Sequence, residues 1–170
     1  MATNTPTATT DPAWWDAWRG VLFASSHSLR ELESMLEEHS GISLNFMDVL
    51  SRLHDAPEQR LRMQELQERA LFTRSGMTRL VDRIEEAGLA RRERVPGDRR
   101  GVFVVLTPAG AEVYESAIEK HRQDVGQVFG RALTQQQCEA VAAALWSFWH
   151  EDEDGGEGEG STRRPPTGRA

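Results

Sequence analysis

The feature that most constrains the fold is a charged turn between two strand-like runs, in a chain otherwise patterned for helix. The runs RRERV and GVFVVL, which end at Val95 and Leu106, flank the sequence PGDRR. Strand-like runs on either side of a Pro-Gly pair are typical of a β-hairpin. The sequence therefore predicts a mainly α-helical fold that contains one small β-hairpin.

A long amphipathic helix is predicted over residues 11–38, where apolar residues recur three, four or seven positions apart. Asp11 would cap this helix and Pro12 would take its first helical position. At about 1.5 Å per residue the helix is roughly 40 Å long, which is long for one small core. Two interpretations stay open: the apolar stripe packs on a second subunit, or its tryptophans fill one end of the protomer's own core. The stripe consists of Trp14, Trp18, Val21, Leu22, Leu29, Leu32 and Leu36.

Three shorter helices are predicted between this long helix and the hairpin. Gly41 ends the long helix, and Ser43 caps the next one. A short helix from Met63 to Arg69 follows. Thr73 is the candidate cap of a third helix, which would end at Gly88.

Two further helices are predicted after the hairpin. Thr107 and Pro108 form a cap and first-turn pair that starts a long helix. Thr134 and Gln137 have the spacing of a capping box at the start of the last helix. Cys138 lies on the apolar stripe of that helix, and we expect it to pack in the core.

The charge is unevenly distributed along the chain. The whole sequence carries a formal net charge of −7, yet residues 60–100 hold eleven arginines against seven acidic residues. A basic stretch within an acidic chain is what an anionic partner such as nucleic acid would bind. A solvated helix face also produces a charge run, so the charge pattern by itself leaves both interpretations open.

Composition and motifs argue against several classes of protein. No apolar run is long enough to span a membrane, and MATNTPTATTDP lacks the basic start and apolar segment of a secretory signal. The single cysteine, Cys138, cannot form an internal disulfide. No nucleophile elbow, phosphate loop or metal-ligand spacing appears. We therefore expect a cytoplasmic protein that is not an enzyme and that needs no cofactor or metal.

The two ends of the chain differ from its body. Residues 1–10 are rich in Thr, Ala and Pro, and residues 151–170 contain an acidic run followed by an Arg/Pro tail. Segments with so few apolar side chains cannot bury enough surface to fold, and we expect both to be disordered. Residues 11–150 then form a single domain.

The order of short helix, tight connection, second helix and β-hairpin is that of a winged helix-turn-helix. In such a fold the second helix enters the major groove of DNA, and residues near its N-terminus reach the base edges. The polar face of this helix presents Arg74, Ser75, Thr78, Arg79 and Arg83. Arg79 is suited to a paired hydrogen bond with a guanine edge. The alternative is an ordinary exposed helix with salt links such as Arg79 to Asp82.

The hairpin tip is a second candidate DNA contact. Asp98, Arg99 and Arg100 lie at this tip, where the arginines have no apolar surface to cover. The negative potential of a narrow minor groove attracts arginine. Asp98 cannot bind phosphate, and we expect it to hold an arginine by a charge-assisted hydrogen bond. A solvated, charge-rich turn is the alternative.

Residues 60–110 resemble the winged helix-turn-helix of MarR-family transcriptional regulators. The string DRRGVFVVLTPAG is similar to the family's wing pattern, and LFTRSGMTRLVDRIEEAGLARRE resembles its recognition helix and the following strand. The wing pattern matches at Asp98, Arg100, Val104, Leu106, Thr107 and Gly110. The order of elements from residue 11 to residue 150 also fits this family.

Carried over residue by residue, this resemblance implies DNA contacts in both grooves. The recognition-helix residues named above, apart from Arg83, would contact the major groove. Arg100, together with Arg99, would enter the minor groove, where Asp98 would brace it. The resemblance also implies a homodimer whose terminal helices pair.

Those dimerisation helices would be residues 11–38 and 108–149, on either side of a winged helix-turn-helix lobe over residues 43–107. A dimer of this kind agrees with the surplus apolar surface of the first helix. The family resemblance thus favours a second subunit as the partner of that surface.

The resemblance implies that a small organic effector, aromatic or acidic, binds between the dimer helices and the DNA-binding lobe. Redox-sensing members keep a reactive cysteine in the first helix, and this chain has none there. Metal-sensing members cluster their ligands, whereas the five histidines here are scattered, although folding could gather them. Trp18, Leu22, His27 and Asp48 are candidates for lining the effector pocket, and each also fits ordinary core packing.

We therefore expect a dimeric, sequence-specific DNA-binding regulator of transcription. Two recognition helices related by a twofold axis would read a pseudo-palindromic operator in double-stranded DNA. We expect a repressor that the effector releases, because a ligand that binds two conformations unequally shifts their populations. The alternative is a winged-helix protein-interaction module without specific DNA binding, which the overall acidity favours.

Overall fold

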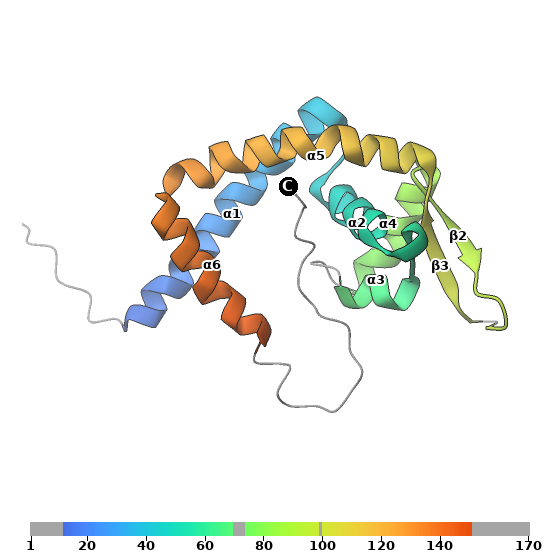
Figure 1. Cartoon of the computed structure of the whole chain (residues 1–170), viewed down its shortest axis with the longest axis horizontal. Helices are drawn as coiled ribbons and strands as arrows, with labels where there is room; N and C mark the ends of the chain where they lie inside the picture. Colours follow the sequence, from blue (N-terminus) through green and yellow to red (C-terminus); the bar gives the residue numbers. More distant parts are fainter. Residues whose placement is uncertain (1–11, 70–73, 99, 151–170) are drawn as a thin grey trace, which may run out of the picture.

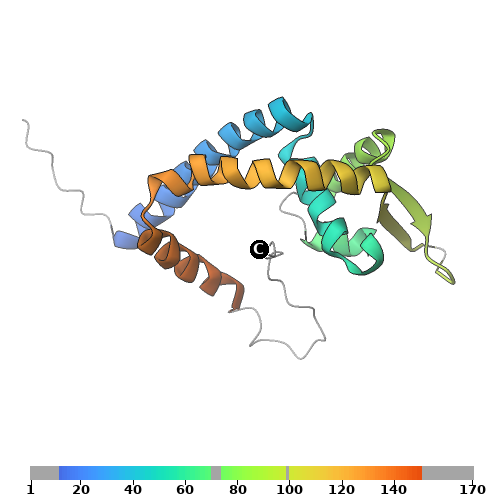
Figure 2. The same ribbon diagram turned by 45° about the horizontal axis from the view of Figure 1, so that its top comes forward.

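The molecule is elongated, with long helices at one end and a lobe of shorter elements at the other. A computed structural model describes residues 12–69, 74–98 and 100–150. Helix α5 (Pro108–Val128) runs from the lobe to the helical end, where α1 (Ala13–Ser40) lies beside it (Figure 1). Helix α6 (Gln135–His150) follows and turns away from the end of α5 (Figure 1). The tilted view shows the same separation of the two ends (Figure 2). None of the described helices is long and apolar enough to cross a membrane.

Helix α1 starts one residue later than expected. Pro12 precedes the helix with φ −59° and ψ 144° instead of occupying its first position, and Asp11 lies outside the described residues. The helix ends at a glycine stop, as predicted. Gly41 takes φ 70°, and its N–H donates to the Glu37 carbonyl at 3.0 Å. Glycine adopts this left-handed conformation without the steric cost that a side chain brings.

Helix α2 (Leu44–Asp55) leads into the lobe. It begins at Ser43, whose hydroxyl accepts a hydrogen bond from the Phe46 N–H at 3.2 Å, so the predicted cap is confirmed. A 3₁₀ turn, η1 (Pro57–Gln59), follows the helix. Proline at the start of this turn cannot continue the preceding helix, because its nitrogen carries no hydrogen.

The helix-turn-helix of the lobe consists of α3 (Met63–Arg69) and α4 (Arg74–Glu86). The predicted bounds of α3 are confirmed. Helix α4 ends just before Gly88, which takes φ 75° as a glycine stop requires. The candidate cap Thr73 lies outside the described residues.

The small sheet has three antiparallel strands in the order β1-β3-β2. Strands β2 (Ala90–Arg94) and β3 (Val102–Leu106) form the predicted hairpin, which is the wing, and β1 (Arg60–Arg62) adds a third strand. Leu61 of β1 and Arg92 of β2 both pair with Val104 of the central strand. The sequence predicts only the hairpin, because a strand of three residues is too short to show an alternating pattern.

Helix α5 is joined tightly to the sheet at its first turn. The Thr107 hydroxyl accepts from the Gly110 N–H at 3.0 Å, and Pro108 is the first helical residue, as predicted. A Cβ atom on Gly110 would lie 2.0 Å from the Leu89 carbonyl oxygen. Glycine is therefore needed here so that the helix can approach the chain before β2.

Helix α6 follows a second 3₁₀ turn, η2 (Gly130–Ala132). The predicted capping box is confirmed: the Thr134 N–H donates to Gln137 Oε1 at 2.8 Å, and the Gln137 N–H donates to Thr134 Oγ1 at 3.3 Å. Cys138 is only half-buried, and no described side chain of α6 is fully buried. The expectation that Cys138 packs in the core is therefore wrong within the single protomer.

The hydrophobic core lies mainly in the lobe, between α2, α3, α4 and the sheet. Its fully enclosed side chains there include Val49, Leu50, Leu53, Leu66, Met77, Val81, Ile84 and Val104. On α1 only Leu32 and Leu36 are buried, whereas Trp14 and Trp18 are 68% and 52% exposed. The interpretation that the tryptophans fill one end of the protomer's core is therefore wrong.

Candidate nucleic-acid interface

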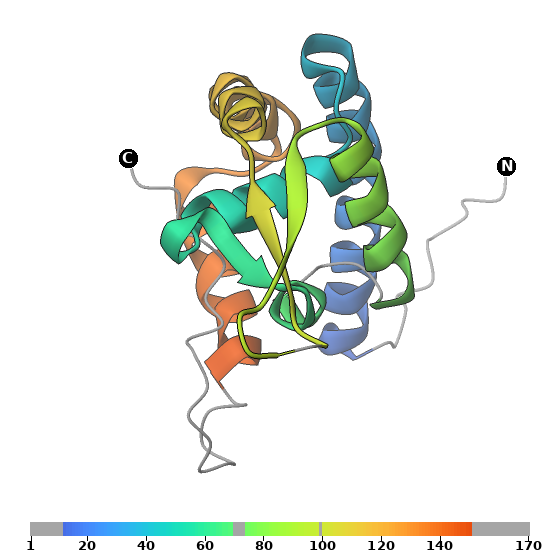
Figure 3. The same cartoon turned by 90° about the vertical axis from the view of Figure 1, so that its right-hand side faces the viewer.

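Helix α4 presents an apolar face to the core and a polar face to solvent. The wing lies beside this helix (Figure 3). Its apolar face is fully buried at Met77, Val81 and Ile84. Thr78 and Arg79 are exposed on the other face. Arg74 and Ser75 are the first two residues of the helix, and their side chains lie outside the described part of the structure. This division lets one face pack while the other remains free for a DNA groove.

Two side chains farther along α4 contact the lobe itself. The Arg83 guanidinium lies over the Phe46 ring of α2, 5.2 Å from the ring centroid. The alternative interpretation of this helix requires a salt link between Arg79 and Asp82. Asp82 instead contacts Nη2 of Arg92 at 2.7 Å. Arg79 has no ion-pair partner among the described residues and stays exposed.

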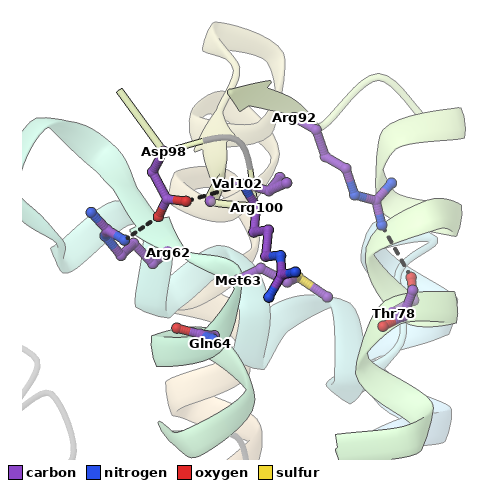
Figure 4. A pocket seen from close by; sticks show the side chains of 9 residues that line it. Arg62, Met63, Gln64, Thr78, Arg92, Asp98, Arg100 and Val102 are labelled. Atoms are coloured by element: carbon purple, nitrogen blue, oxygen red, sulfur yellow. Dashed lines mark hydrogen bonds and ion pairs between the residues drawn. The ribbon is translucent and has the colours of Figure 1, made fainter. Parts of the chain in front are cut away.

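Arg92 of β2 joins the wing to α4. Its guanidinium contacts Asp82 Oδ1 at 2.7 Å and Glu85 Oε2 at 2.6 Å. It also donates to the Thr78 carbonyl at 3.3 Å, the bond drawn in Figure 4. The Arg92 N–H also donates to the other Glu85 oxygen at 2.8 Å. Because these bonds cross from the sheet to the helix, they set the position of the wing stem relative to α4.

The wing turn is organised around the carboxylate of Asp98. Gly97 takes φ 80°, and Asp98 Oδ1 accepts from the Arg100 N–H at 3.0 Å. A Cβ atom on Gly101 would lie 2.6 Å from Asp98 Oδ2, so glycine leaves room for the carboxylate. The Arg100 side chain is exposed, and Arg99 lies outside the described residues.

Asp98 holds an arginine by a charge-assisted hydrogen bond, as predicted, and this arginine is Arg62, which lies outside the wing. Nη1 of Arg62, on β1, donates to Asp98 Oδ2 at 3.2 Å (Figure 4). The two residues are 36 positions apart. The resemblance implies that Asp98 braces Arg100 of the wing; at Arg100 the carboxylate accepts from the backbone N–H at 3.0 Å. No local pattern marks Arg62, because its position opposite the wing depends on β1 pairing with β3.

The pKa of Asp98 lies below its ordinary value. The largest cause is the hydrogen bond from the Arg100 N–H, which desolvation opposes; the Gly101 N–H and the Arg62 guanidinium lower the pKa further. The carboxylate is therefore charged at neutral pH. A charged carboxylate repels phosphate, so Asp98 serves the wing turn and is unsuited to contact the DNA backbone.

A hollow of about 340 Å³ separates the wing from α3 and α4. It is lined by Arg62, Met63, Gln64, Thr78, Arg92, Asp98, Arg100, Gly101 and Val102. Figure 4 shows Arg100 reaching from the wing into the space between Met63 and Thr78. Arg62 and Arg92 are paired with carboxylates, whereas Arg100 has no ion-pair partner among the described residues. Arg100 is thus the lining cation that is free for an anionic partner.

The residues suggested for an effector pocket do not meet within one protomer. Trp18, Leu22 and His27 are exposed in the N-terminal half of α1. Figure 1 shows that this half of the helix leans away from the lobe. Asp48 is half-buried on α2, where its Oδ1 contacts Arg52 Nη2 at 2.8 Å. The other carboxylate oxygen of Asp48 is buried without a hydrogen-bond partner among the described residues.

The three-helix core, the three-stranded sheet and the exposed arginines define a winged helix-turn-helix protein of the DNA-binding type. A sequence model of the MarR family matches residues 40–101. The chain is 30% identical to Sco3205, a MarR family transcriptional regulator from Streptomyces coelicolor whose crystal structure contains DNA. The match covers 84% of this chain and 94% of that one, with a TM-score of 0.75. The protein belongs to the MarR family of transcriptional regulators.

Two further comparisons extend this result. The chain is 27% identical to the HTH-type transcriptional regulator YkoM of Bacillus subtilis, over 72% of this chain and 75% of that protein. It shares its fold with the organohalide-sensing regulator RdhR, solved in a form bound to 2,4-dichlorophenol. That structure is 15% identical with a TM-score of 0.74, over 89% of this chain and 88% of that one.

Proposed function

We propose that the protein is a homodimeric repressor that binds a pseudo-palindromic operator in double-stranded DNA. The observation that carries this proposal is that Arg79 on α4 and Arg100 on the wing are both exposed at the lobe. Neither has an ion-pair partner among the described residues. Arginines that are not neutralised by carboxylates are available to base edges and phosphates.

In this proposal α4 enters the major groove, where Arg74, Ser75, Thr78 and Arg79 contact the bases and the backbone. Arg100, with Arg99, enters the adjacent minor groove. Arg83 contributes less than its neighbours, because its guanidinium already lies over the Phe46 ring. Two copies related by a twofold axis would place their recognition helices about one helical turn of DNA apart.

Selection of bound fragments from genomic DNA, followed by fluorescence anisotropy on the selected duplex, tests the DNA contacts. We expect Arg79→Ala to weaken binding about tenfold and to relax the preference at one base position. Arg100→Ala should weaken binding to all duplexes. It should also reduce, by about one, the steepness with which the logarithm of the binding constant falls with the logarithm of the salt concentration. Arg131→Ala is the matched control, because it removes one exposed arginine from η2, at the helical end.

The affinity of Arg131→Ala should stay within twofold of the unmodified protein. An Arg100→Ala variant with unchanged affinity would contradict the role of the wing. If the unmodified protein enriches no duplex even at low salt, it is a protein-interaction module instead.

The proposed effector is a small organic molecule that carries a hydrogen-bond donor. Asp48 Oδ2 and Asn45 Oδ1, both on α2, are buried acceptors without a donor among the described residues. A phenol hydroxyl would satisfy such an acceptor, and the related regulator RdhR was solved with a phenol. Because Trp18, Leu22 and His27 are remote from Asp48 in one protomer, the partner subunit would have to supply them.

Competition of phenols with bound DNA tests this part of the proposal. We expect 2,4-dichlorophenol, as the probe, to release the duplex. Its methyl ether, 2,4-dichloroanisole, has nearly the same shape but no donor and should not release the DNA. Equal release by both compounds would contradict the role assigned to the buried acceptors.

A further inference from the structure

Arg62 and Asp98 form a bridge from β1 to the tip of the wing, and none of the DNA contacts proposed above includes it. We infer that Arg62 is a positioning residue: by binding Asp98 it fixes the wing tip, and with it Arg100, relative to α3 and α4. This inference rests on the proposed DNA binding, because it gives Arg62 a part in presenting the wing to the minor groove.

Contacts other than the one with Asp98 also hold Arg62 in place. Its backbone N–H donates to Glu65 Oε2 at 2.8 Å, which fixes the chain at the start of α3. It pairs with Phe103 across the β1–β3 ladder, and its guanidinium lies 5.7 Å from the centroid of that ring. An isolated surface ion pair is weak partly because two flexible side chains must be ordered. Here that entropic cost is reduced on the arginine side.

Asp98 connects Arg62 to the backbone of Arg100. One carboxylate oxygen, Oδ2, accepts from Arg62, and the other, Oδ1, accepts from the backbone N–H of Arg100. The missing side chain of Gly101 lets the carboxylate lie close to the turn, since a Cβ atom there would be 2.6 Å from Oδ2. A single carboxylate thus connects β1 to the residue that carries the free guanidinium of the wing.

The wing stem is attached to the lobe independently of this bridge. Arg92 anchors β2 to Asp82 and Glu85 of α4. Loss of the Arg62–Asp98 pair should therefore release the tip of the wing and leave its stem in place. The expected consequence is a weakened minor-groove contact with an unchanged major-groove contact.

Arg62 is also 44% exposed, so a direct contact between its guanidinium and a DNA phosphate is the competing explanation. A double-mutant cycle separates the two roles. The variants are Arg62→Ala, Asp98→Ala and the double variant, measured by anisotropy on the selected duplex. The matched control is Arg60→Ala. Arg60 lies on the same strand and its guanidinium contacts the Phe103 ring, but it pairs with Glu58 and not with Asp98.

We expect Arg62→Ala to weaken binding about tenfold in the unmodified background and to have no further effect when Asp98 is already alanine. Arg60→Ala should change the affinity less than twofold. Hydroxyl-radical protection of the minor groove should be lost in Arg62→Ala, while methylation protection in the major groove remains. Circular dichroism should report the same melting temperature for Arg62→Ala and Arg60→Ala.

An Arg62→Ala variant that binds within twofold of the unmodified protein would overturn the inference. A double variant that loses affinity multiplicatively would also overturn it, because Arg62 would then contact DNA independently of Asp98. If the unmodified protein binds no duplex, the proposed function fails first. That result is distinct from one in which the protein binds DNA and Arg62 has no effect.

Discussion

At the scale of single residues, Asp124 is the charged side chain that the structure places fully inside, among the residues it describes. It lies on α5, where Oδ1 contacts Lys120 Nζ at 2.5 Å, and its Oδ2 contacts Nε2 of His39 on α1 at 2.9 Å. Desolvation raises the pKa of Asp124, but the hydrogen bonds and charges of Lys120 and His39 together outweigh it. The pKa therefore lies below its ordinary value. The contact between His39 and Asp124 joins the C-terminal end of α1 to α5.

Folding brings two of the scattered histidines near this carboxylate. His121, on α5, is a second group whose pKa depends on Asp124. Burial lowers the pKa of His121; the charge of Asp124 opposes this, and that of His39 adds to it. Nδ1 of His121 is buried without a hydrogen-bond partner in the described part of the chain. Within that part, no three His, Cys, Asp or Glu side chains form a group suited to a metal ion.

We predict that Asp124→Asn lowers the free energy of unfolding at pH 7 by about 1–3 kcal/mol, because the neutral amide loses two charge-assisted hydrogen bonds. Urea denaturation followed by circular dichroism measures this change. Glu119→Gln is the control, since it makes the same kind of substitution at an exposed position of the same helix. Equal stability of the two variants would contradict the role of Asp124.

The effect of Asp124→Asn should depend on pH in a defined direction. Because the pKa of Asp124 is lower in the folded chain than its ordinary value of 3.8, the charged carboxylate stabilises the fold above that value. This stabilisation is lost as the pH falls through the lower, folded-state pKa. The difference between the unmodified protein and Asp124→Asn should therefore shrink between neutral and strongly acidic pH. Urea denaturation series at several pH values measure it.

At the scale of elements, the junction between α5 and the sheet depends on the absence of one side chain. We predict that Gly110→Ala destabilises the protein by about 1–3 kcal/mol or more, because the new Cβ atom would lie 2.0 Å from the Leu89 carbonyl oxygen. Thermal unfolding by calorimetry measures the loss. The same substitution on the same helix at Gly126, which has nothing within 4 Å, should instead stabilise the helix slightly.

A Gly110→Ala protein that unfolds at the temperature of Gly126→Ala would show that α5 can shift away from the strand without cost. In that case the close approach at residue 110 would not determine the position of α5. The comparison isolates the local clash, because both substitutions add one methyl group to the same helix.

At the scale of the whole molecule, the unsatisfied surface is the N-terminal part of α1. Trp14, Trp18, Leu22 and Leu29 are 48–68% exposed in the single protomer. A large exposed apolar surface of this kind is typical of a protein interface. The proposed homodimer would bury it and would place two DNA-binding lobes on one operator.

We predict that the protein is a dimer in sedimentation equilibrium and that Trp18→Glu raises the dimer dissociation constant at least about tenfold, because a carboxylate would be buried in an apolar interface. Gln64→Glu, at an exposed position of α3, introduces the same charge in the lobe and should leave the dissociation constant unchanged. A protein that sediments as a monomer at micromolar concentration would contradict the proposed assembly.

The sequence was sufficient to predict those features of the fold that depend on a few neighbouring residues, such as helix caps and helix ends. Ser43, Thr107 and the Thr134–Gln137 pair cap their helices as predicted, and Gly41 and Gly88 end theirs. These signals are reliable because the hydrogen bonds and dihedral angles involved lie within one turn of the chain. Helix periodicity and the hairpin pattern were sufficient for the mainly helical, winged fold.

The partners of the charged side chains were decided only by the tertiary structure. Arg62 meets Asp98 across 36 positions, and His39 meets Asp124 across 85. Arg92, rather than Arg79, is the partner of Asp82. An ion pair depends on where two distant backbone segments come to lie, and many opposite charges along a chain of this composition are equally plausible partners. Local sequence therefore determined where the helices and the wing form. The pairing of β1 with β3 and the contact of β2 with α4 determined which arginines remain free.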